Sequence, residues 1–298
     1  MSLELGIQLW GVKDFMAKNF YGTIKSVSDM GYSCVELATY REDSEAIAFD
    51  AKDMKRIFDD LGLKCVSSHT FPGTLKDLME NSQKLLDLSS FNWDKMIEDA
   101  CIMGMDCVTL AGNFYTNPKE DIPRVIDVLN TVGEKAKEKG LFIQYHNHYM
   151  EFEEYEGKYI YDYMIEETNP DYVKFEVDTY WTIRAGQDPL KILDRLKGRI
   201  DVIHQKDLPG DWPQKNALEI LGGKGGTIID LLTKVEVPGS FIELGKGCID
   251  IESIMKKAYE TGVKYVLVEQ SFASPGLDDL TSHCINYNYL KDILDKIK

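Results

Sequence analysis

One pattern of apolar and polar positions recurs along the chain: an amphipathic stretch, then a single glycine, then a short apolar run. It occurs around five glycines, which are Gly31, Gly62, Gly104, Gly140 and Gly262. A glycine after an amphipathic stretch is typical of a helix end, where the backbone takes a positive φ. Short apolar runs without alternation are typical of parallel strands that are buried on both faces. The pattern therefore predicts alternating helices and parallel strands.

Eight apolar runs are predicted strands, and they lie at 6–10, 34–38, 64–69, 107–111, 142–146, 174–178, 202–206 and 265–269. Amphipathic segments between them predict helices, among them 51–60, 93–103, 122–139, 188–197 and 250–260. Eight such strands close into a (β/α)8 TIM barrel of the α/β class, which we expect to be a single domain over residues 1–298. An open doubly wound sheet is the alternative, and the lack of a GxGxxG motif between a strand and a helix disfavours it.

The stretch 207–248 is the longest irregular part of the chain. It contains Pro209, Pro213, Pro238 and a glycine-rich run at 222–226. We expect a long loop with a helix near 226–234, over the active-site end of the barrel. The glycine-rich run could bind an anion through backbone N–H groups, but a flexible loop is the simpler interpretation. We therefore favour an unphosphorylated substrate.

The charge of the chain limits its partners. The sequence has 34 Lys and Arg against 50 Asp and Glu, a formal net charge of −16 over 298 residues. Such a surface repels phosphate backbones and anionic lipid, so we expect no nucleic-acid and no membrane partner. No apolar run is long enough for a membrane-spanning helix, and no secretion signal precedes the first strand. The six cysteines form no CxxC pair, which fits reduced thiols in the cytoplasm.

Polar side chains gather where the predicted strands end, which is where TIM barrels carry their chemistry. His146, Asp178, His204 and Glu269 end four consecutive predicted strands, the fifth to the eighth. Any one of them alone could be an ordinary residue of the barrel rim. Together their side chains can converge on one point above the barrel. Two imidazoles and two carboxylates suit Mn²⁺, Zn²⁺, Fe²⁺ or Co²⁺ better than Ca²⁺.

Other groups surround this point and are candidates for substrate binding. They are Glu36 and His69, which we place at the ends of the second and third strands, and the aromatic residues Trp10, Tyr145, Tyr180 and Trp181. Flat aromatic walls are common in sugar-binding pockets. Lys206 lies two residues after His204, so both can face the barrel interior. A surface lysine at a strand exit is the alternative interpretation. Glu151 and Arg184 lie in the loops that follow the fifth and sixth strands.

Several phrases of the sequence match a known family. They are YHNHYMEF (145–152), FEVDTYWTIRAGQDPLKILDRLKGRI (175–200), VIHQKD (202–207), LGKGCIDI (244–251) and VLVEQ (266–270). On these phrases the chain resembles the xylose isomerase-like barrel superfamily of sugar isomerases, epimerases and related lyases, from about residue 4 to the C-terminus. The resemblance implies one bound divalent ion, with Mn²⁺ the first candidate and Zn²⁺, Co²⁺, Fe²⁺ or Mg²⁺ as alternatives.

The resemblance also implies roles for individual residues. Asp178, His204 and Glu269 fall on three ligand positions of the family. His146 stands at the fourth, where the family usually has a glutamate, although a subgroup shares the HNH phrase. His148 would then contact substrate. Many relatives read G-E-G where this chain has glycines on both sides of Lys246.

The family's epimerases and isomerases use two glutamates as an acid and base, and here only Glu269 remains of that pair. We expect Glu269 to act as ligand and base, with His148 or Lys206 as its catalytic partner, while His69, Glu36 and Glu151 are further candidates. This set favours a metal-dependent isomerase or epimerase that removes a proton α to the carbonyl of a keto-sugar or related polyol.

Other functions stay open at this point. A lyase is the first alternative, either dehydrating an inosose-like ketone or eliminating from a 3-keto glycoside. A non-catalytic sugar-binding barrel is the second. An apurinic-site endonuclease, also known in this superfamily, needs more metal ligands than this set provides. It also needs a basic groove, which the net charge of −16 opposes. Relatives often form dimers or tetramers, so a homo-oligomer is an open alternative to a monomer.

Overall fold

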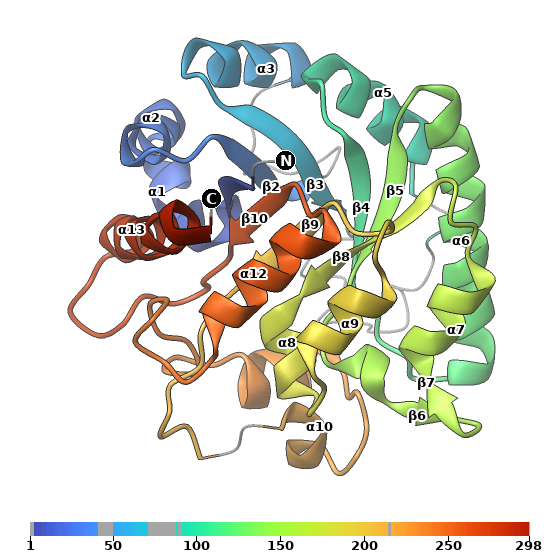
Figure 1. The fold of residues 1–298 in the computed structure, drawn as a ribbon. Coiled ribbons are helices and arrows are strands. Elements are labelled where there is room, and N and C mark those ends of the chain that lie inside the picture. The colour runs from blue at the N-terminus through green and yellow to red at the C-terminus, as the bar shows by residue number, and fades with distance from the viewer. Residues whose placement is uncertain (1–2, 41–49, 71–87, 89–90, 214–215, 298) are drawn as a thin grey trace.

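Eight parallel strands close into a barrel in the computed structural model, which describes residues 3–40, 50–70, 88, 91–213 and 216–297. Around the ring the strands follow the order β1-β10-β9-β8-β5-β4-β3-β2 (Figure 1). Their bounds are Glu4–Gln8, Cys34–Tyr40, Lys64–Thr70, Cys107–Ala111, Phe142–His146, Val173–Asp178, Val202–Gln205 and Tyr265–Val268 for β1, β2, β3, β4, β5, β8, β9 and β10. The predicted (β/α)8 barrel is confirmed, and the open sheet is excluded.

Helices form the outer layer of the barrel (Figure 1). Their bounds are Lys13–Lys18, Phe20–Met30, Ala51–Asp60, Trp93–Met103, Pro118–Glu138, Ile160–Glu167, Thr179–Arg184, Pro189–Arg195, Ala217–Ile220, Ile228–Asp230, Ile251–Thr261 and Asp279–Ile297 for α1, α2, α3, α5, α6, α7, α8, α9, α10, α11, α12 and α13. α13 packs against α2 and β1, so the last helix lies beside the first strand. Gly31 and Gly262 follow α2 and α12 with φ of 105° and 86°, as the repeated pattern predicts.

The first strand differs from its prediction. The apolar run predicts a strand over residues 6–10, but β1 ends at Gln8 and the 3₁₀ helix η1 (Leu9–Val12) follows it. The Gln8 side chain accepts a hydrogen bond of 2.5 Å from the Trp10 backbone N–H, which turns the chain at this point. A side chain that satisfies the first free N–H of a helix stabilises its start, and the apolar run alone does not show this.

The barrel interior changes in character along its axis. Near the amino ends of the strands it is filled by a small apolar cluster of Cys34, Val66, Val202, Tyr265 and Leu267. Gly6 lies against this cluster, because a Cβ there would be 2.4 Å from Leu267 Cδ2. Every second residue of a strand faces the barrel interior. Toward the carboxyl ends of the strands these inward-facing side chains are polar. The interior is thus largely apolar near the amino ends of the strands and polar toward their carboxyl ends.

The described segments that follow β5 and β9 lie at one end of the barrel, toward the bottom of Figure 1. They include the 3₁₀ helix η3 (Met150–Phe152), the hairpin β6 (Glu154–Tyr155) and β7 (Lys158–Tyr159), and α10. The stretch 207–248 is largely irregular, and α11 with the π-helix η4 (Leu231–Val235) lies where the sequence predicts a helix near 226–234.

Asp207 fixes the end of this stretch. Its carboxylate accepts backbone hydrogen bonds of 2.9 Å from Gly245, 3.0 Å from Gly247 and 3.1 Å from Ile249. A carboxylate with several N–H donors is a strong anchor. The segment 244–249 is therefore tied to the residue that follows Lys206.

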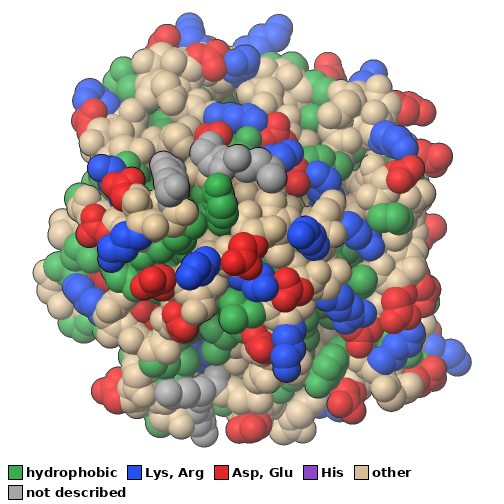
Figure 2. Space-filling model, in the orientation of Figure 1, with side chains coloured by type: hydrophobic (Ala, Val, Ile, Leu, Met, Phe, Trp, Pro, Cys, Tyr) green, Lys and Arg blue, Asp and Glu red, His purple; other side chains and the backbone are tan. Residues whose placement is uncertain are grey.

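The outer surface carries interspersed acidic and basic side chains on the face that Figure 2 shows. Within the described ranges, no helix combines the length and the apolar character that crossing a membrane requires.

Candidate metal centre at the carboxyl end of the barrel

Four side chains that the sequence predicts to converge do lie together. His146 is the last residue of β5, Asp178 is the last residue of β8, and Glu269 directly follows β10. His204 lies in β9, where it pairs in register with Asp178. Each residue offers one imidazole nitrogen or carboxylate oxygen, and these four atoms lie within 4.8 Å of one another. The strand order of the barrel produces this cluster, because β5, β8, β9 and β10 are consecutive neighbours.

The donor set suits a divalent cation of intermediate softness. Nε2 of His146, which faces Asp178 Oδ2 at 4.0 Å, is buried without a hydrogen-bond partner among the described residues. Buried polar atoms in folded proteins almost always have a partner, so such atoms point to a ligand. Burial, together with the neighbouring charges of His69 and His204, holds the pKa of His146 well below its usual range. His146 is therefore a neutral imidazole, the form that binds metals. This group of residues could hold a metal ion.

Lys206 enters the same cluster from β9's carboxyl end. Its ammonium is buried, hydrogen-bonds to Asp178 Oδ2 and lies 2.6 Å from Glu269 Oε2. Burial alone would lower the pKa of Lys206, but the two carboxylates outweigh it and raise that pKa above its ordinary value. Burial likewise opposes ionisation of Glu269, yet Lys206 and His204 hold the pKa of Glu269 well below its usual range. The cluster therefore contains an ammonium and a carboxylate side by side.

Two predicted substrate contacts lie deeper than expected. Glu36 and His69 are buried inside the barrel, with His69 Nε2 2.9 Å from Glu36 Oε1. The apolar runs place both at strand ends, but β2 continues to Tyr40, so Glu36 lies mid-strand, and His69 points inward from β3. Burial disfavours the His69 cation, but Glu36 and Glu176 outweigh it and raise the pKa of His69 to about 9. They form a polar layer beneath the candidate ligands.

Glu176 belongs to this inner layer and was missed in the sequence. Its carboxylate is fully buried and lies 3.1 Å from His69 Nε2. It precedes Asp178 by two residues, so both face the barrel interior. The signal was this spacing, which an apolar run of the form VKFEVD conceals.

The aromatic candidates take different positions. Trp181 borders the cluster, because its ring centroid lies 5.6 Å from that of His148 and 5.4 Å from Lys206 Nζ. Trp10 lies in η1 and is half-buried beneath Lys13. Tyr145 is turned away from the cluster, since it is one residue from His146 on the strand and faces the outer layer.

Tyr145 and Glu151 together support the HNH phrase from outside the barrel. The Tyr145 hydroxyl donates to Glu151 Oε1 at 2.5 Å, and the His148 backbone N–H donates to Glu151 Oε2 at 2.8 Å. Burial raises the pKa of Glu151 to about 7, although these hydrogen bonds oppose the rise. Glu151 therefore positions His148 and is not itself among the clustered groups.

His148 lies beside the cluster, half-buried, with its ring centroid 4.9 Å from that of His146. Its Nδ1 has no hydrogen-bond partner among the described residues. Burial and the charge of Lys206 lower the pKa of His148 to about 3, so the ring is neutral. The neutral ring can donate a hydrogen bond through one nitrogen and accept one through the other.

A second carboxylate, Glu236, approaches this region from the irregular stretch. Ser271 Oγ donates to Glu236 Oε1 at 2.5 Å, and Ser271 follows Glu269 by two residues. Burial raises the pKa of Glu236 against this hydrogen bond, and the charge of Glu269 adds to the rise. No local pattern in VEVPGS indicates this position. Arg184, another loop candidate, is buried and donates to the Tyr180 hydroxyl at 2.7 Å.

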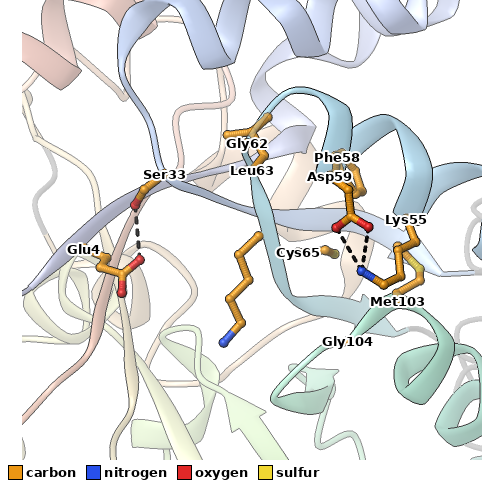
Figure 3. A pocket seen from close by; sticks show the side chains of 11 residues that line it. Glu4, Ser33, Lys55, Phe58, Asp59, Gly62, Leu63, Cys65, Met103 and Gly104 are labelled. Carbon is orange, nitrogen blue, oxygen red and sulfur yellow. Dashed lines mark hydrogen bonds and ion pairs between the residues drawn. The ribbon is translucent and has the colours of Figure 1, made fainter.

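A separate pocket of about 460 Å³ lies at the amino ends of β1 and β3, opposite the cluster (Figure 3). Glu4, Ser33 and Lys64 line it, together with the ion pair of 2.8 Å between Lys55 and Asp59. None of the described residues that line it is a histidine. In TIM barrels the amino end serves stability and the carboxyl end serves chemistry.

The class of protein follows from comparison with known families. The family model described as Xylose isomerase-like TIM barrel matches residues 24–283. The chain belongs to this family, as its sequence phrases suggested.

Two relatives named inosose dehydratase are similar to the chain over different lengths. The chain is 30% identical over 166 residues to a protein of Clostridium beijerinckii named inosose dehydratase, covering 55% of this chain and 52% of that protein. This match thus spans about half the length of the relative. A Geobacillus kaustophilus protein, also named inosose dehydratase, is 23% identical over 290 residues, covering 92% of this chain and 86% of that protein.

Solved structures show the same fold. A sugar phosphate isomerase/epimerase from Parabacteroides distasonis superposes with a TM-score of 0.74 at 23% identity, covering 97% of this chain and 98% of that chain. The IOLI protein with a bound zinc atom superposes with a TM-score of 0.67 at 14% identity, covering 99% of each chain.

Proposed function

We propose that the chain is a divalent-metal-dependent lyase that removes a proton α to the carbonyl of an unphosphorylated keto-polyol and releases water from the next carbon. The observation that carries this proposal is the position of the Lys206 ammonium 2.6 Å from the Glu269 carboxylate, within the cluster of candidate ligands. The inosose dehydratases among the relatives support a keto-polyol as substrate.

The metal would be held by His146, Asp178, His204 and Glu269. A divalent ion there would polarise the substrate carbonyl and stabilise the negative charge that develops on its oxygen. Mn²⁺ is our first candidate, and Zn²⁺ is the ion in the IOLI structure.

The chain's own residues supply the proton transfers. Glu269 is ionised and accepts the proton from the carbon next to the carbonyl. Lys206 is protonated and donates to the hydroxyl that leaves, so a C–H and a C–O bond break while a C=C bond forms and water departs. The proton on Glu269 can then return to Lys206 over the 2.6 Å between them. An acid and a base held in contact with each other thus restore their starting states.

The surroundings orient the substrate. The Trp181 ring offers a flat apolar wall beside Lys206 and His148. The neutral His148 ring can hydrogen-bond a further hydroxyl of a polyol through its unpartnered Nδ1.

Isomerisation or epimerisation of a keto-sugar is the second candidate. It begins with the same proton abstraction, and the structural neighbours named sugar phosphate isomerase/epimerase favour it. In that case the proton returns to the substrate and the hydroxyl stays.

One experiment separates these outcomes. The purified chain with added Mn²⁺ is incubated in D₂O with a panel of inososes and keto-sugars, beside Glu269→Gln, and the products are followed by NMR and by enone absorbance. We expect water loss by the wild type and none by the variant. Deuterium incorporation without water loss would favour isomerisation. No reaction together with no metal in the protein would favour a non-catalytic barrel.

A further inference from the structure

Beneath the candidate ligands lies a layer of buried polar side chains that the proposed reaction does not use. Its centre consists of Glu36 of β2, His69 of β3 and Glu176 of β8, all at most 4% exposed. They come from strands on different sides of the barrel, so only the closed fold brings them together. Charged groups in so dry a place must satisfy one another.

Both candidate ligand imidazoles contact this layer with one nitrogen and the rim with the other. For His146, Nδ1 lies 3.2 Å from Glu176 Oε2, whereas Nε2 faces Asp178 Oδ2 at 4.0 Å. For His204, Nε2 lies 2.9 Å from Glu36 Oε1, whereas Nδ1 lies 2.8 Å from Glu269 Oε2. Each ring therefore spans the two layers.

The two carboxylates of the inner layer are themselves held in place. Gln144 Nε2 donates to Glu176 Oε1 at 3.0 Å, and the Ser67 hydroxyl donates to Glu36 Oε2. His69 Nε2 lies between the two carboxylates, 2.9 Å from Glu36 and 3.1 Å from Glu176. Such contacts leave neither carboxylate free to rotate toward the rim.

We propose that Glu176 and Glu36 are positioning residues that fix the tautomers of the two ligand histidines. Glu176 holds a proton on Nδ1 of His146 and Glu36 holds one on Nε2 of His204, which leaves the opposite nitrogen of each ring to bind the metal. This inference rests on the proposed metal site. Carboxylates behind metal-binding histidines orient the ring and raise its basicity in other metal centres.

A second cation in the inner layer is the competing explanation. His69, His146, Glu176 and His204 also offer ligand atoms within 4.8 Å of one another. However, His69 Nε2 is within hydrogen-bond distance of both inner carboxylates, and Gln144 and Ser67 already donate to them. An ion in the inner layer would compete with the Gln144 amide and the Ser67 hydroxyl for these two carboxylates, and metal stoichiometry tests this explanation.

The tautomers can be observed directly in the wild-type protein. The chain has five histidines, so ¹⁵N-histidine labelling of the Zn²⁺-loaded protein gives few long-range ¹H–¹⁵N correlations to assign. We expect a protonated Nδ1 in His146 and a protonated Nε2 in His204. The opposite pattern in either ring would overturn the inference, and this measurement requires no variant to fold.

Metal titration of Glu176→Gln and Glu36→Gln tests whether these two carboxylates strengthen metal binding. We expect one metal per wild-type chain, a Kd raised about 10–100-fold in either variant, and a shifted Co²⁺ absorption spectrum. Asp201→Asn is the matched control, because Asp201 is a buried carboxylate at the opposite end of the barrel, 2.6 Å from Lys174. It should leave the Kd and the spectrum unchanged.

The outcomes distinguish the inference from the proposed function. A wild-type chain that binds no Mn²⁺, Zn²⁺ or Co²⁺ would overturn the proposed function. One bound ion with unchanged Kd and spectrum in both variants would overturn the positioning role alone. Two ions per chain, with one lost in Glu176→Gln, would replace it with a second metal site.

Discussion

Lys206 Nζ lies 2.6 Å from Glu269 Oε2, and the two residues directly follow the neighbouring strands β9 and β10. The same ammonium hydrogen-bonds to Asp178. The Lys206 ammonium therefore shares its two carboxylate partners, Asp178 and Glu269, with the proposed metal ion. Two cations that share carboxylates compete through charge repulsion, which is strong in a buried site.

Lys206→Gln should separate metal binding from catalysis. We expect tighter binding of Mn²⁺, because the competing ammonium is gone, and a kcat about 10²–10⁴-fold lower, because the proton donor is gone. Isothermal titration and turnover measurements check both. Lys234→Gln is the control, since Lys234 is an exposed lysine paired to Asp230 at 2.7 Å. Weaker metal binding in Lys206→Gln, or turnover at the wild-type rate, would contradict the assigned role.

Asp178→Asn should remove the metal while keeping the fold. Asp178 Oδ1 caps α8 by accepting the Trp181 backbone N–H at 2.8 Å, and asparagine caps helices about as well as aspartate. The substitution therefore deletes one negative ligand without deleting the cap. Substituting a residue that hydrogen-bonds to a metal ligand typically raises the metal Kd ~10–100-fold. We expect a larger rise for Asp178→Asn, because Asp178 is itself a proposed ligand, and little change in Tm.

Asp188→Asn provides the matched control for this change. Asp188 caps α9 by accepting the Leu190 N–H at 2.9 Å and lies outside the cluster. It should alter neither metal content nor turnover. Equal metal content in Asp178→Asn and the wild type, measured after dialysis, would remove Asp178 from the ligand set.

The sequence predicts the barrel because a helix, a glycine and a buried strand leave a repeated local signal. It predicts the rim residues for a related reason: His146 and Asp178 stand where an apolar run stops. Strand ends are local features, and parallel strands bring them to one edge whatever the details of the packing. The four candidate ligands can therefore be grouped from the sequence alone.

The position of a side chain along the barrel axis is not a local feature, so the sequence does not predict which polar residues lie deep in the barrel. Glu36 and Glu176 lie inside strands whose apolar neighbours hide them, and their partners come from other strands. Tyr145 shows the second difficulty, since one position along a strand separates the interior from the outer layer. Glu236 shows a third, because the irregular stretch returns to the site without a pattern that predicts it.

The stability of the chain should depend on the titration of Glu151. Burial raises its pKa from 4.5 to about 7, so between these values the folded chain holds a proton that the unfolded chain releases. The stabilisation is complete below about pH 4.5 and is lost as the pH rises to 7. Over this window the free energy of unfolding should fall by about 3 kcal/mol through this group.

Glu151→Gln isolates this contribution, because glutamine keeps the shape but does not titrate. Urea denaturation at pH 5 and pH 7.5 should show a smaller loss of stability in Glu151→Gln than in the wild type. Glu154→Gln, an exposed neighbour, should follow the wild type. The same pH dependence in all three proteins would show that Glu151 titrates at its ordinary pKa.

Gly247→Ala tests whether the segment 244–249 supports the site. A Cβ at this position would lie 2.2 Å from Asp207 Oδ1 and 2.4 Å from the Leu208 carbonyl oxygen. Both atoms are fixed by hydrogen bonds or backbone, so the contact must displace Asp207, the residue next to Lys206. We expect a loss of about 1–3 kcal/mol of stability and a lower kcat, measured by thermal unfolding and by turnover.

Gly210→Ala is the matched control for this substitution. Among the described residues its Cβ would meet only Cys248 Cβ, at an ordinary 3.8 Å, so it should leave kcat unchanged and stability equal or slightly higher. If Gly247→Ala loses stability but keeps its kcat, Asp207 anchors the loop without positioning Lys206. If neither variant differs from the wild type, the carboxylate of Asp207 does not hold this segment in solution.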